Sequence, residues 1–106
     1  MGVFSRRSSR PGTVRTADRA DLDHLRAFAA SRTGVEAYLE PRTAVTEATV
    51  VLVAADGEWT RRRVGGPDAA AKLAKSLAVP LYEAERVGYP QRMRDWTARR
   101  AATEPG

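Results

Sequence analysis

The sequence contains no cysteine, and this absence excludes several kinds of chemistry at once. Disulfides, thiolate zinc sites, iron–sulfur clusters and thiol catalysis all require cysteine. His24 is the only histidine, which rules out a metal site built from several histidines. No apolar run approaches the roughly 18 residues of a membrane span, and the N-terminus shows no export or lipidation pattern. We therefore expect a cytoplasmic protein with no metal, no cofactor and no membrane partner.

The charges that are present are distributed unevenly along the chain. The net charge is +5, yet residues 18–60 carry eight acidic groups against four basic ones. Residues 1–17 carry four arginines and no acidic group, and residues 61–100 carry ten basic groups against four acidic ones. Such a basic tail and basic C-terminal half suit contact with phosphate or an acidic protein surface. GC-rich coding, which favours arginine over lysine, is the alternative explanation.

The length of 106 residues leaves room for one domain. Residues 1–17 lack hydrophobic periodicity and are rich in serine, arginine, proline and glycine. Such a composition buries too little apolar surface to offset the entropy of ordering, so we predict a disordered basic tail there. Residues 18–100 are predicted to form a single α+β domain, and residues 101–106 a disordered C-terminus.

Periodicity and turn residues predict seven elements within this domain. Asp18 is placed to cap a first helix and Gly34 to end it, while Asp56-Gly57 is a strong hairpin signal because glycine accepts a positive φ. The order α-β-β-β-α-β-α predicts the class α+β, a small antiparallel sheet with helices mainly on one face. The predicted elements are a helix at 19–32, strands at 35–41, 46–55 and 58–64, a helix from 67 that ends before 80, a short strand at 81–86 and a basic helix at 91–100.

A two-residue hairpin loop also predicts which residues of the second and third strands share a face. It places Leu52 and Arg61 opposite each other on one face of the sheet, and it places Val51 on the other face. We predict that the face with Val51, Val53 and Val64 is the core. The open face would then carry Trp59, Arg61 and Arg63 beside Glu36, Tyr38 and Glu40.

The first candidate surface is formed by Arg61 and Arg63 beside Trp59. Two arginines and an aromatic ring on an exposed strand suit a phosphate backbone with a stacked base. The alternative is a solvated sheet face, on which glutamates neutralise the arginines in ion pairs of under about 1 kcal/mol each. Arg62 is assigned to the scaffold in both interpretations. The glutamates available for such pairs are Glu36, Glu40 and Glu58.

The second candidate surface is the segment GYPQRMRDW at residues 88–96. Tyr89, Met93 and Trp96 recur at helical spacing and form one stripe, which arginines flank. The stripe is core if it packs on the sheet, and a partner surface if the helix docks loosely. The predicted partner-binding residues are therefore Trp59, Arg61, Arg63, Tyr89, Arg92, Arg94 and Trp96, and we assign no catalytic, cofactor-binding or metal-binding residue.

Two resemblances accompany these patterns. The order helix, three strands, helix resembles that of a double-stranded-RNA-binding domain, and DGEWTRRRVGGPDAAAKLAKSLA aligns with the last hairpin and second helix of that domain. The resemblance implies phosphate contacts at the start of this helix, where the chain has Pro67 and Asp68 followed by alanines.

The second resemblance rests on GVEAYLEPRTAVTEATVVLVAADGEWTRRRV and GYPQRMRDW. Over roughly residues 18–100 the chain is similar to a group of small uncharacterised actinobacterial proteins, some of which carry the label oxidoreductase. The quoted residues contain no flavin, nicotinamide or redox motif.

The leading hypothesis is a small non-catalytic binding module whose basic-aromatic surface contacts an acidic partner. That partner is RNA, including ribosomal RNA, or a protein surface. One alternative is an oxidoreductase-like enzyme or enzyme accessory, as the second resemblance implies. The other is a structural homodimer joined through an exposed sheet face or an edge strand.

Overall fold

The computed structural model describes residues 17–103 and confirms the class α+β. The tails were predicted at residues 1–17 and 101–106, and of these residues 1–16 and 104–106 lie outside the described part of the chain. The last helix ends at Thr103, three residues beyond its predicted end. The elements are α1 (Arg19–Ser31), β1 (Glu36–Glu40), β2 (Thr49–Val53), β3 (Trp59–Arg63), α2 (Pro67–Leu77), β4 (Leu81–Glu83), α3 (Ala84–Val87) and α4 (Gln91–Thr103).

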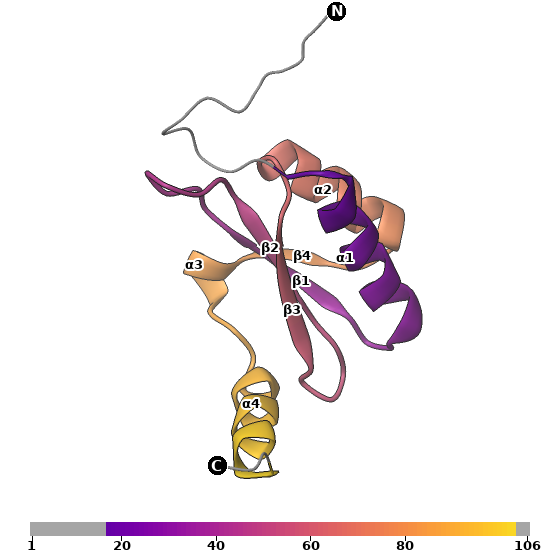
Figure 1. The fold of residues 1–106 in the computed structure, drawn as a ribbon, viewed down its shortest axis with the longest axis vertical. Helices are drawn as coiled ribbons and strands as arrows, with labels where there is room; N and C mark the ends of the chain where they lie inside the picture. Colours follow the sequence, from indigo (N-terminus) through magenta and orange to yellow (C-terminus); the bar gives the residue numbers. More distant parts are fainter. Residues whose placement is uncertain (1–16, 104–106) are drawn as a thin grey trace, which may run out of the picture.

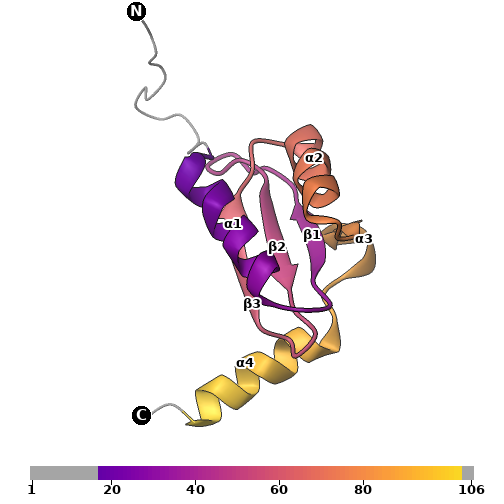
Figure 2. The ribbon, with the colours of Figure 1, turned by 90° about the vertical axis from the view of Figure 1, so that its right-hand side faces the viewer.

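The four strands form one sheet in the order β3-β2-β1-β4. The first three strands are antiparallel neighbours, whereas β4 runs parallel to β1, so the sheet is mixed and not antiparallel throughout. A parallel pairing needs a crossover, and α2 supplies it by carrying the chain from β3 at one edge to β4 at the other. α1 and α2 lie side by side over one face of the sheet, while α4 lies beyond the hairpin end of β3 (Figures 1 and 2).

The start of α1 is fixed by a capping box. The Asp18 carboxylate accepts a hydrogen bond from the Asp21 N–H at 3.0 Å, and the Asp21 carboxylate accepts one from the Asp18 N–H at 3.2 Å. Each side chain thereby satisfies a backbone donor that the first helical turn leaves without a partner. Leu25 and Phe28 on the buried side of α1 then pack into the core. This arrangement holds Asp21 next to β3.

The hairpin between β2 and β3 differs from its prediction by one residue. Val53 lies opposite Trp59 and Val51 opposite Arg61. The loop has three residues and not two, because Ala54 N–H donates to the Glu58 carbonyl oxygen at 2.8 Å. Gly57 has a φ of 95°, which is typical of a three-residue loop that ends in a glycine bulge.

This shift separates the three valines that were predicted to share one face. Val64 is buried under α1 and α2, on the same face as Val50 and Leu52. Val51 and Val53 belong to a second apolar cluster on the opposite face, with Tyr38 and Met93 among its members. All three predicted core valines are therefore buried, but not on one face as predicted, because β2 is a central strand that is buried on both faces.

Candidate binding site beside the edge strand

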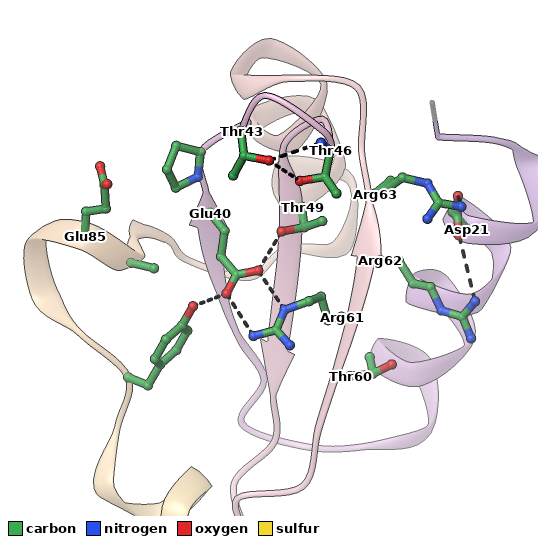
Figure 3. Close-up of a pocket in the computed structure, with 13 residues that line it drawn as sticks. Asp21, Glu40, Thr43, Thr46, Thr49, Thr60, Arg61, Arg62, Arg63 and Glu85 are labelled. Carbon is green, nitrogen blue, oxygen red and sulfur yellow. Dashed lines mark hydrogen bonds and ion pairs between the residues drawn. The ribbon is translucent and has the colours of Figure 1, made fainter. Parts of the chain in front are cut away.

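A depression of about 990 Å³ lies beside β3 (Figure 3). Its wall includes Glu40 and Arg61 from the face of the sheet opposite α1, and Thr60 and Arg62 from the side that faces α1. Because residues from both sides of β3 line it, the depression extends over the outer edge of this strand. The full lining is Asp21, Glu40, Pro41, Thr43, Thr46, Thr49, Thr60, Arg61, Arg62, Arg63, Ala84, Glu85 and Tyr89.

Glu40 is the centre of a hydrogen-bond network on one side of the depression. Arg61 donates from Nε to Oε1 at 2.7 Å and from Nη2 to Oε2 at 2.9 Å, a bidentate pair. The Thr49 hydroxyl donates to Oε1 at 2.5 Å, and the Tyr89 hydroxyl donates to Oε2. The network joins β1, β2 and β3 to the segment that precedes α4 (Figure 3).

The network also fixes the ionisation of its members. Burial is the largest influence on Glu40 and opposes its charge, but the hydrogen bonds from Arg61, Thr49 and Tyr89 together hold the pKa of this carboxyl below its ordinary value. Burial, followed by the hydrogen bond to Glu40, raises the pKa of Tyr89. Near neutral pH Glu40 is therefore charged and Tyr89 is neutral.

A second carboxylate lies on the other side of β3. Asp21 Oδ1 is 3.8 Å from Arg62 Nη1, and Asp21 Oδ2 is 3.5 Å from Arg63 Nη2. The side chain of Asp21 is 5% exposed and that of Arg62 is 42% exposed. The pair between Glu40 and Arg61 has the same arrangement, with exposed fractions of 19% and 43%. In both pairs the anion is recessed and the cation faces solvent.

His24 of α1 contacts the same strand. Its Nε2 is 2.6 Å from the Thr60 hydroxyl, and its Nδ1 is 3.3 Å from Arg62 Nη2. Arginine only donates hydrogen bonds, so His24 Nδ1 accepts from Arg62. In the neutral ring Nε2 then carries the hydrogen, and it donates to the Thr60 hydroxyl. Burial, followed by the charge of Arg62, lowers the pKa of His24, which agrees with this neutral form.

The sequence prediction placed Trp59, Arg61 and Arg63 together on the open face. Arg61 does lie beside Trp59, with its guanidinium 5.3 Å from the ring centroid. Arg63 instead reaches toward Asp21 of α1, so the three residues do not form one surface. Trp59 is half-buried, and its Nε1 donates to the Thr97 hydroxyl of α4 at 2.9 Å.

Of the four predicted residues near the C-terminus, only Tyr89 lines the depression. Arg92 points toward the sheet, where it donates to the Ala54 carbonyl oxygen at 2.9 Å and to Glu36 at 2.7 Å. Arg94 bonds to Gln91 and to the Tyr89 carbonyl oxygen at the start of α4.

Trp96 lies at the junction of α4 with the hairpin. It is half-buried, and a Cβ added at Gly57 would lie 2.9 Å from its Cβ. Met93 is buried against Val51 and Val53, as the core interpretation of this stripe expects. The segment GYPQRMRDW thus anchors α4 to the sheet.

Several residues of the depression were not singled out from the sequence. No binding role was assigned to Asp21 from the sequence, and Arg62 was assigned to the scaffold. The spacing of Asp18 and Asp21 does match a capping box, which predicts the helix start but not that β3 lies against it. The lining threonines carry no sequence signal beyond their preference for strands and turns. They are Thr43, Thr46, Thr49 and Thr60.

Comparison with family models, with curated proteins and with solved structures gives no match for this chain. The two family resemblances therefore stay predictions. Within residues 17–103, no helix is long and apolar enough to cross a membrane. The same residues contain no group of three or more acidic or histidine side chains placed to hold a metal ion.

Proposed function

We propose that the protein is a small non-catalytic binding module that contacts an acidic partner through the edge of β3. The observation that carries this proposal is the difference in exposure within the two ion pairs. The side chains of Arg61 and Arg62 are more exposed than the carboxylates with which they pair. A guanidinium has five N–H donors. Arg61 uses two of its donors on Glu40, so its outward side retains donors for a partner.

The chemistry of the depression favours binding over catalysis. General acid–base catalysis works best when the pKa of the catalytic group lies near the working pH. Glu40 and Tyr89 are the titratable pair at the centre of the network. The pKa of Glu40 is lowered and that of Tyr89 is raised, so both are shifted away from neutral pH. Glu40 also accepts several hydrogen bonds, one of them from the Tyr89 hydroxyl, which suits a structural support for Arg61.

An acidic protein segment fits this surface better than RNA does. Base stacking needs an open aromatic face, but Trp59 is half-buried and the Arg61 guanidinium lies over its ring. On the far wall of the depression Glu85 is exposed, and its charge repels a phosphate backbone that crosses from β3 to α3. The cationic surface is thus a narrow band along β3.

Fluorescence anisotropy with a short labelled peptide rich in glutamate tests the proposal. We expect binding that weakens as salt is added. Replacing both Arg61 and Arg62 with alanine should weaken it roughly tenfold, because each exposed ion pair contributes on the order of 0.5–1 kcal/mol. Arg26→Ala, which removes one positive charge from an exposed site on α1, is the control and should leave the affinity unchanged.

Three results would overturn the assignment. The first is that the wild-type protein fails to bind the peptide even at low salt. The second is that Arg26→Ala weakens binding as much as the double substitution. The third is that labelled single-stranded RNA binds more tightly than the peptide and loses affinity in the variant lacking Arg61 and Arg62. That result assigns the same surface to nucleic acid.

A further inference from the structure

We infer that the acidic segment binds in extended form and adds to the sheet as a fifth strand along β3. This inference rests on the proposed function and specifies the conformation of the partner. β3 is an edge strand, with β2 as its neighbour on one side and no described strand on the other. Strand addition to an exposed sheet edge is a recurring mode of peptide recognition, in which main-chain hydrogen bonds supply affinity.

The hydrogen bonds of the hairpin show which backbone groups face outward. Ala54 N–H donates to Glu58 C=O at 2.8 Å, and Val64 N–H donates to Ala48 C=O at 3.0 Å. In an antiparallel pair the residues that bond to the neighbour alternate with residues that do not. The even-numbered residues from 58 to 64 therefore face β2. The backbone N–H and C=O groups of Trp59 and Arg61 point to the outer edge.

The side chains along this edge indicate the charge of the added strand. Arg61 and Arg62 are consecutive, so they point to opposite faces of the sheet, and both are more than 40% exposed. Two consecutive acidic residues on the added strand also point to opposite faces. One lies beside Arg61 over the depression and the other beside Arg62 near α1. The recognised feature is thus an acidic pair within an extended segment.

The same charges disfavour a second copy of this chain as the occupant. Two β3 strands paired edge to edge would bring arginines close to arginines, and like charges directly opposite each other destabilise a sheet. Charged edge strands are a common protection against self-association. The arginines of β3 therefore act selectively, because they repel another β3 and attract an acidic strand.

The test uses three forms of one labelled peptide with an acidic pair between threonines and valines. One form is unmodified, and the other two are N-methylated at alternate residues, at odd positions in one and at even positions in the other. The two edges of a strand use alternate N–H groups. One N-methylated form should therefore keep the parent affinity, and the other should bind roughly tenfold more weakly because it lacks the donors that reach β3.

Amide hydrogen exchange supplies a second readout on the intact protein. Bound to the unmodified peptide, the amides of Trp59 and Arg61 should exchange at least several-fold more slowly, because the added strand accepts their hydrogen bonds. Amides in α2 should be unaffected.

The outcomes distinguish failure of strand addition from failure of the proposed function on which it rests. Equal affinity for all three peptides, or unchanged exchange at Trp59 and Arg61, overturns strand addition but retains an acidic partner. Equal loss in both N-methylated forms also counts against it. Failure of the unmodified peptide to bind overturns the proposed function itself.

A pair of variants probes the same point from the protein side. Arg61→Thr and Arg61→Pro both remove the charge, but only proline removes the outward N–H, and proline is tolerated at the outer edge of a sheet. We expect Arg61→Pro to bind the unmodified peptide more weakly than Arg61→Thr. Equal affinities of the two variants, with both folded by circular dichroism, contradict a backbone contact at this residue.

Discussion

Two parts of the molecule combine arginine with tryptophan, and the structure places them differently. In α4, Arg92 and Glu36 are equally recessed, with 32% and 31% of their side chains exposed, and Arg92 also bonds to the Ala54 carbonyl oxygen. In β3, Arg61 is 43% exposed while its partner Glu40 is 19% exposed. The first arginine holds a helix against the sheet, and the second presents its charge to solvent.

The difference shows that composition alone does not identify a binding surface. Both arginines are ion-paired, so counting charges makes the two regions look the same. What distinguishes them is the depth of the carboxylate relative to the guanidinium. A recessed anion orients the cation from below and leaves its outer donors for a partner. The following predictions test this distinction, in order of decreasing effect.

The largest effect is expected where α4 meets the hairpin. In Gly57→Ala the added Cβ would lie 2.0 Å from the Arg92 carbonyl oxygen, so the backbone of α4 must move. The φ of 95° adds strain for any residue with a Cβ. We expect a loss of about 3 kcal/mol in the free energy of unfolding, measured by urea denaturation.

Gly88→Ala is the matched control for this substitution. Gly88 also has a positive φ, of 71°, but nothing lies within 4 Å of an added Cβ. Its loss should be about 1–2 kcal/mol, from backbone strain alone, because its ψ of −179° lies in a region that residues with a Cβ rarely adopt. If the two variants are equally destabilised, α4 does not dock on the hairpin as described.

The next effect separates two arginines of the same helix. Arg92→Ala removes bonds to Ala54 and Glu36 and should cost about 1–2 kcal/mol in the free energy of unfolding. Arg94→Ala removes an exposed side chain that bonds only within the start of α4, and should cost less than about 0.5 kcal/mol. Urea denaturation of both variants measures the difference. Equal losses contradict the structural role of Arg92.

Glu40→Gln is expected to move stability and binding in opposite directions. Loss of the carboxylate removes the charged partner of Arg61 and should lower the free energy of unfolding by about 1 kcal/mol. It also removes the internal competitor for Arg61, so an acidic peptide should bind more tightly. Denaturation and anisotropy on one preparation test both effects. Weaker binding by this variant would show that Glu40 orients Arg61 more than it competes for it.

The smallest effect concerns the stability of the protein at acidic pH. The folded-state pKa of Glu40 is below the ordinary value of 4.5, so Glu40 favours the folded state fully above about pH 4.5. This contribution is lost as the pH falls through the lowered pKa. Stability should therefore decrease below about pH 4.5, and less steeply in Glu40→Gln than in the wild type. Glu85→Gln, at an exposed residue, is the control and should follow the wild-type profile.

Local sequence signals account for much of the fold. The Asp18 cap, the Asp56-Gly57 turn and Pro67 at the start of α2 were all recognised, because each acts on the backbone within a few residues. Asp-Gly occurs in both two- and three-residue loops, so the predicted hairpin register differs from the observed register by one residue. The three residues of β4 give no local indication that they join β1 in parallel.

The candidate site was predictable in its residue types but not in its geometry. Arg61 and Tyr89 were selected as polar and aromatic residues in basic stretches. The depth of Glu40 depends on the register of three strands, and the depth of Asp21 on the packing of α1 against β3. Both are long-range features, and they decide which arginines face solvent.

The most direct test of the central claim is an NMR titration of the intact protein with the acidic peptide, which follows backbone amides and arginine Nε–H signals together. The account predicts shift changes at Trp59, Arg61 and Arg62, with α4 beyond Thr97 unaffected. Changes centred on Arg94 and the exposed end of α4, with β3 unchanged, would contradict it.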